Sequence, residues 1–123
     1  MVLVPSLINR AAILDLRPGQ SLVEHLLGAG LDVYSVDWGE PSAADAHLDL
    51  KAYALRLLPS ALQAARRESA AASVHVFGYC LGGTLALIQG QPSPPFHTVA
   101  GRAATSRTRT RTFGLASRLK RPG

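Results

Sequence analysis

The chain has 123 residues, of which 47% are hydrophobic and 17% are charged, and this length allows one domain with its own hydrophobic core. No apolar run approaches the roughly 20 residues that span a bilayer, and the first residues lack the charged region and long apolar stretch of a signal peptide. The single cysteine, Cys80, excludes an internal disulfide and any metal site that needs several cysteines. We therefore expect a cytoplasmic protein without a metal ion or cofactor.

The net positive charge comes from one end of the sequence. Residues 1–90 carry six Lys or Arg together with all eight acidic residues, whereas residues 91–123 carry seven Lys or Arg and no acid. Such an asymmetry indicates two segments of different character. We predict one domain over residues 1–90, followed by a basic tail over residues 91–123.

The first predicted elements alternate between strand and helix. Residues 2–4 are a short apolar run closed by Pro5, which is typical of the end of a buried strand. Ser21 can cap a helix that ends at Gly30, and Glu24 stands where a capping box needs it. Residues 31–37 are rich in Val and Tyr and predict a second strand.

The second half of the domain repeats this order. An apolar stripe predicts a helix over residues 49–68, with Pro59 expected to kink or split it. Residues 73–77 predict a third strand, which turns sharply through residues 78–83 into a helix from Thr84 to about Gln89. Strands that alternate with helices predict an α/β fold with a parallel sheet of about three βα units. Its ligand-binding loops should follow the carboxyl ends of the strands.

The helical pattern is lost after Gln89. Prolines interrupt residues 92–95, and the rest of the chain is dominated by Arg, Thr, Ser, Ala and Gly. We predict that residues 91–123 are largely disordered. The alternating Arg and Thr residues would also suit electrostatic binding of nucleic-acid phosphates, although Phe113 is the only aromatic residue near them for base stacking.

Residues 78–82 follow the Gly-x-Cys-x-Gly pattern of a nucleophile elbow, with Cys80 in the position that serine usually takes. A tight turn between strand and helix leaves no room for side chains at Gly78 and Gly82, and Gly83 extends the small-residue run. The positive end of the following helix favours the thiolate of Cys80, and the amide of Leu81 would point at a developing oxyanion. The alternative is a buried structural cysteine in a βα turn.

A family resemblance is carried chiefly by three segments, Pro5-Ser6-Leu7-Ile8-Asn9-Arg10, Asp37-Trp38-Gly39-Glu40-Pro41 and Gly78-Tyr79-Cys80-Leu81-Gly82-Gly83-Thr84. In this order they resemble the polyhydroxyalkanoate synthases, a family with an α/β-hydrolase fold. The resemblance covers about residues 3–88, and its Asp-Trp-Gly loop is most similar to the two-subunit class (class III).

The resemblance implies a partial α/β-hydrolase-type sheet and an acyltransferase that moves 3-hydroxyacyl groups from coenzyme A thioesters onto a polyester held on Cys80. Coenzyme A would be part of the substrate, and a second synthase subunit and polyester granules are the partners that the family suggests. Ile8 would offer a second oxyanion amide, as the loop after an early strand does in this fold. Asp37 and Trp38 either shape the pocket or form a packing Trp beside a solvated Asp.

The chain departs from the family after the elbow. No Asp or Glu follows Glu68, and His97 is the only histidine after Cys80, although the acid and base of this fold follow the nucleophile. We therefore expect a truncated or frame-disrupted synthase that is inactive alone. The alternatives are another α/β-hydrolase that cleaves esters or thioesters, and a non-enzymatic binding module with a basic tail.

Overall fold

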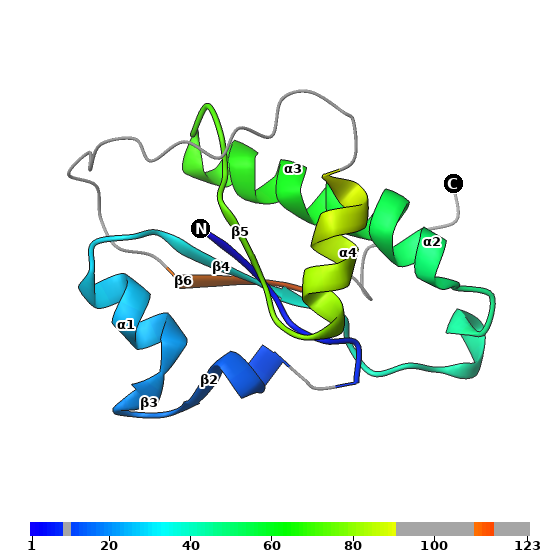
Figure 1. Cartoon of the computed structure of the whole chain (residues 1–123), viewed down its shortest axis with the longest axis horizontal. Helices are drawn as coiled ribbons and strands as arrows, with labels where there is room; N and C mark the ends of the chain where they lie inside the picture. Colours follow the sequence, from blue (N-terminus) through cyan, green and yellow to red (C-terminus); the bar gives the residue numbers. More distant parts are fainter. Residues whose placement is uncertain (9–10, 91–109, 115–123) are drawn as a thin grey trace.

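A four-stranded parallel sheet forms the centre of the computed structural model, which describes residues 1–8, 11–90 and 110–114 (Figure 1). The strand order is β5-β1-β4-β6, and all three neighbouring pairs are parallel. The four strands are β1 (Val2–Val4), β4 (Val33–Asp37), β5 (Val76–Gly78) and β6 (Thr110–Gly114). This confirms the predicted α/β arrangement.

Helices cover both faces of the sheet (Figure 1). On one face, Val2, Val4 and Val36 pack against α3 (Leu58–Ser69) and α4 (Leu81–Gln89). On the other face, a smaller cluster joins Leu3 and Val33 to α1 (Leu22–Gly28) and to a 3-10 turn (Ala11–Leu14). Because side chains alternate along a strand, the fully buried β1 supplies apolar residues to both clusters.

The first helix begins as the sequence predicts. The Ser21 side chain accepts the Glu24 amide at 2.9 Å and caps α1. The Glu24 carboxylate accepts the Gly19 amide instead of closing a capping box on Ser21. This bond is available because Gly19 lies in the turn between two short antiparallel strands, β2 (Asp15–Arg17) and β3 (Gln20–Ser21).

The sequence predicts a kink or a split at Pro59, and the structure shows a change of helix type before it without a break in the helix. The helix runs from α2 (Leu50–Ala52) through a π-helical segment (Tyr53–Leu57) into α3, and Pro59 stands in the first turn of α3. Proline has no amide hydrogen to donate one turn back, and π-type bonding beside it is a common way to accommodate this loss. A short 3-10 turn (Ala43–Asp45) precedes the region.

Two boundaries and one strand differ from the prediction. The third strand is shorter than expected and α4 starts at Leu81, three residues earlier than predicted. The fourth strand, β6, lies within the segment that we expected to be disordered, most of which falls outside the described residues. Thr and Phe are favoured in strands, and the outer edge of β4 offers free backbone groups for pairing, so this short piece pairs from Val33 to Asp37.

Candidate active site

Cys80 lies at the sharp turn between β5 and α4, as the Gly-x-Cys-x-Gly pattern predicts. Its backbone angles are φ 55° and ψ −125°, and its side chain is exposed. A non-glycine residue held at positive φ costs on the order of 1–3 kcal/mol and persists where the surrounding structure enforces it. Two amides enforce it here, because Gly82 donates to the Tyr79 carbonyl at 3.0 Å and Gly83 donates to the Cys80 carbonyl at 2.9 Å.

The elbow glycines are needed because the backbone packs tightly around the turn. A Cβ atom on Gly78 would lie 2.7 Å from the Gly83 nitrogen and 2.8 Å from the Gly82 oxygen. A Cβ atom on Gly82 would lie 2.6 Å from the Pro5 oxygen and would also collide with the Val4 carbonyl. No side chain fits at either position, which confirms the steric argument made from the sequence.

The end of β1 anchors the elbow to the centre of the sheet. The Tyr79 amide donates to the Val4 carbonyl at 2.9 Å, next to the contact that Gly82 makes with the same strand. The following carbonyl, that of Pro5, accepts the indole Nε1–H of Trp38 at 3.0 Å. The Pro5 peptide thus lies against the elbow helix and is also fixed by the loop after β4. The sequence alone gave no indication of this link.

Asp37, Trp38 and Ile8 come together beside this link, although they are distant in sequence. They share a cavity of about 340 Å³ between the loops that follow β1 and β4, whose lining consists of Leu7, Ile8, Ala11, Asp37, Trp38, Gly39, Glu40 and Pro41. The Trp38 ring packs edge-on against Tyr53 with ring centroids 5.4 Å apart. The Asp37 carboxylate accepts the Gly39 amide at 2.9 Å, which shapes the loop. The cavity opens at the carboxyl edge of the sheet, where α/β proteins bind ligands.

The two amides proposed for the oxyanion site differ in their surroundings. Leu81 is the first residue of α4, where an amide has no partner within the helix. The Ile8 amide donates to the Ser6 hydroxyl at 3.3 Å, and the Ile8 side chain is 86% exposed. Ser6 itself is buried, and the turn that it makes after Pro5 is one that serine commonly forms. This local bond was missed in the sequence analysis.

The catalytic partners of the elbow are not identified among the described residues. No group of three His, Cys, Asp or Glu side chains in the described ranges could hold a metal ion. His97, the only histidine after Cys80, falls outside those ranges.

Among the helices that the structure describes, none is long and apolar enough to cross a membrane.

The chain is similar to proteins named poly(3-hydroxyalkanoate) polymerase subunit PhaC. It is 44% identical to the protein from Haloferax mediterranei and 42% identical to that from Haloarcula marismortui, in each case over 88 residues that make up 72% of this chain and 18% of the relative. It is 36% identical over 85 residues to the protein from Cupriavidus necator, covering 69% of this chain and 14% of the relative. The chain thus spans less than a fifth of these relatives. No family model and no solved structure matches it.

Proposed function

Since this chain belongs to the poly(3-hydroxyalkanoate) polymerase family, we propose that it carries the nucleophilic segment of such an enzyme, with Cys80 as the residue that holds the acyl chain. The observation that carries the proposal is the backbone of Cys80, which is held at positive φ in an exposed residue. That geometry is costly for an ordinary turn and is expected for a nucleophile that must stand clear of the sheet.

The proposed chemistry is thioester exchange. The Cys80 thiolate attacks the carbonyl carbon of a 3-hydroxyacyl-CoA, a new carbon–sulfur bond forms, and the bond to coenzyme A breaks, so that CoA leaves as its thiolate and takes a proton from solvent. Attacking and leaving groups are chemically alike, which suits a cysteine nucleophile. The hydroxyl oxygen of a further 3-hydroxyacyl group then attacks the Cys80 thioester. An ester carbon–oxygen bond forms, the carbon–sulfur bond to Cys80 breaks, and the released thiolate takes the hydroxyl proton. The Leu81 amide would stabilise the oxyanion formed in the first step.

The order and direction of the strands support an α/β-hydrolase-type sheet. The strand that leads into the elbow pairs with β1, and β1 pairs with β4, all in parallel. The loops after β1 and β4 then open on the same edge as Cys80. We propose that the 340 Å³ cavity lined by Trp38 and Asp37 forms part of the acyl-binding region. A second subunit and an association with polyester granules remain predictions from the family.

Comparison with the relatives favours a polymerase over another thioesterase, because every similar protein reported above carries the polymerase name. The isolated chain should nevertheless not catalyse repeated release of CoA. No acidic residue follows Glu68, so the acid that supports the catalytic base in this fold has no candidate after Cys80. Purified protein should therefore release no more CoA from 3-hydroxybutyryl-CoA than a Cys80→Ala control.

A chimera tests the proposal directly. Residues 1–90 of this chain would replace the matched segment of the Haloferax mediterranei relative, and polyester formation would be measured for the chimera and for its Cys80→Ala variant. We expect the chimera to polymerise and the variant to lose all activity. If the Cys80→Ala chimera still makes polyester, Cys80 is not the nucleophile. If the chimera folds but is inactive, this segment cannot replace the matched segment of the relative.

A further inference from the structure

The Trp38 side chain connects three parts of the described structure. Its indole Nε1–H donates to the Pro5 carbonyl at 3.0 Å, across 33 positions of sequence. Its ring packs edge-on against Tyr53, at the start of the π-helical segment. It also lines the 340 Å³ cavity between the loops after β1 and β4. A partly buried indole needs an acceptor for its N–H, and the acceptor here is a peptide that also contacts the elbow.

The Pro5 carbonyl is held from two directions. The backbone at Gly82 on α4 approaches so closely that a Cβ atom there would lie 2.6 Å from the Pro5 oxygen. The Trp38 N–H reaches the same oxygen from the loop after β4. Because a peptide group is planar, a fixed Pro5 carbonyl also fixes the direction of the Ser6 amide. Trp38 thereby determines how the loop after β1 leaves the sheet beside the elbow.

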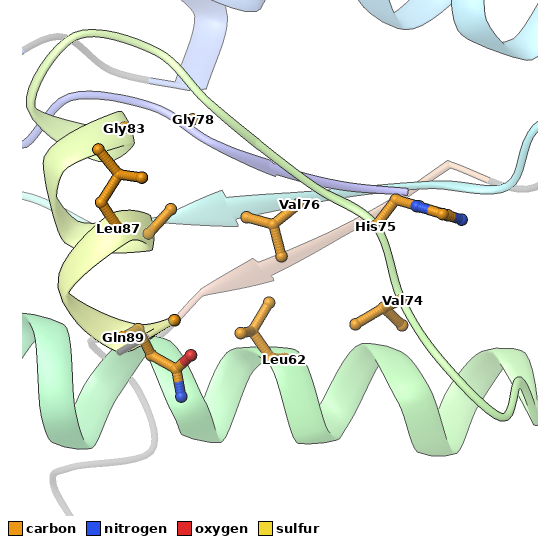
Figure 2. A pocket seen from close by; sticks show the side chains of 10 residues that line it. Leu62, Val74, His75, Val76, Gly78, Gly83, Leu87 and Gln89 are labelled. Atoms are coloured by element: carbon orange, nitrogen blue, oxygen red, sulfur yellow. The ribbon is translucent and has the colours of Figure 1, made fainter. Parts of the chain in front are cut away.

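A different side of the elbow lacks such a contact. There the elbow borders a cavity of about 460 Å³ that is lined by residues of β5, α3 and α4. Figure 2 shows Gly78 and Gly83 beside this cavity, where β5 ends and α4 begins. A cavity offers no atoms for the elbow to pack against. Within the described residues, contacts on the Pro5 side therefore set the position of the elbow relative to the loop after β1.

We propose that Trp38 is a positioning residue for the reaction at Cys80. This inference rests on the proposed function and names the residue that holds the loop after β1 in place for it. The Ile8 amide donates to the Ser6 hydroxyl at 3.3 Å, beyond the range of about 2.7–3.2 Å that N–H···O bonds usually have. So long a bond is readily exchanged for one to an oxyanion, provided that the loop stays beside the elbow. Trp38 meets that condition through its bond to Pro5.

The test compares two reactions of Cys80 in the full chain. In acylation by p-nitrophenyl acetate, the thiolate attacks the carbonyl carbon, a carbon–sulfur bond forms, and p-nitrophenolate leaves as the carbon–oxygen bond breaks. This reaction passes through an oxyanion, whereas alkylation by iodoacetamide displaces iodide and forms none. The ratio of the acylation rate to the alkylation rate therefore reports on oxyanion stabilisation, separately from the exposure and charge of the sulfur. Cys80→Ala gives the background for both rates.

Trp38→Phe keeps an aromatic ring and removes the indole N–H. We expect the ratio to fall about tenfold, which is less than the loss of about 100-fold or more on removing an oxyanion donor itself. The matched control is Tyr53→Phe, which changes the other ring of the pair and leaves the bond from Trp38 to Pro5 in place. This control should leave the ratio unchanged.

Circular dichroism of each variant guards against loss of folding. If Trp38→Phe fails to fold, replacement of Trp38 by 3-benzothienylalanine carries the same expectation, because that residue keeps the size of the ring and lacks only the N–H. A ratio in the parent chain no higher than that of a cysteine-containing peptide would contradict the oxyanion site of the proposed function, and this inference with it. A higher ratio that Trp38→Phe leaves unchanged would overturn this inference alone. So would equal falls in Trp38→Phe and Tyr53→Phe, whereas a fall confined to loss of the indole N–H would support it.

Discussion

The two sides of strand β5 are built differently. Its inner side pairs residue by residue with β1, and the elbow that follows packs so closely that Gly78 and Gly82 have no room for a side chain. Its outer side has no paired strand among the described residues, and Val76 and Leu87 remain exposed beside it. The contrast teaches that residues 1–90 supply the local geometry of the proposed nucleophile, whereas the structure describes no further strand on the outer side of β5.

The largest loss of stability should come from adding a side chain on the inner side of β5, where the elbow packs on β1. Gly82→Ala places a methyl group against the backbone of Val4 and Pro5, which cannot move without disturbing β1. We expect the free energy of unfolding to fall by about 3 kcal/mol or more, at or beyond the upper end for overpacking. Urea denaturation followed by circular dichroism measures it.

Gly28→Ala is the matched control for this change. Gly28 lies in helix α1, and a Cβ atom there would meet nothing within 4 Å. The control should leave stability unchanged or raise it by up to about 1 kcal/mol. Equal losses at Gly82 and Gly28 would contradict the close packing of the elbow on β1.

A smaller effect on stability should distinguish the buried face of α4 from its exposed face. Leu85 is fully buried in the core and Leu87 is 74% exposed. Leu85→Ala should lower the free energy of unfolding by about 2 kcal/mol, at the low end for a buried leucine, because α4 lies beside β5, the terminal strand of the described sheet. Leu87→Ala should change the free energy of unfolding by less than about 0.5 kcal/mol. Urea denaturation measures both, and similar losses would show that α4 packs on both faces.

The parts of the fold that could be predicted from sequence are those fixed by neighbouring residues. The Ser21 cap, the strand over residues 33–37 and the elbow at Cys80 depend on local sterics and on hydrogen bonds to residues nearby in the chain. The elbow was also recognisable because glycine is required on both sides of the nucleophile.

Features that depend on distant parts of the chain could not be predicted. The pairing of β6 with β4 joins segments more than seventy residues apart, and local composition, rich in Arg and Thr, indicated disorder instead. The bond from Trp38 to the Pro5 carbonyl depends on the register of β1 and β4. The Ile8 amide was expected to face an oxyanion and lies in a turn with Ser6, a competing local bond that a pattern of residue types does not rank.

The most direct test of the central claim is the reactivity of Cys80. The chain has a single cysteine, so the rate of alkylation by iodoacetamide reports on this sulfur alone. The rate in the folded chain would be compared with the rate in urea at the same pH. Each rate would be divided by the alkylation rate of a cysteine-containing peptide in the same solvent. The account predicts faster alkylation in the folded chain, because the elbow exposes Cys80 at the positive end of α4, which stabilises negative charge on the attacking sulfur. Alkylation that is equal or slower in the folded chain would contradict it.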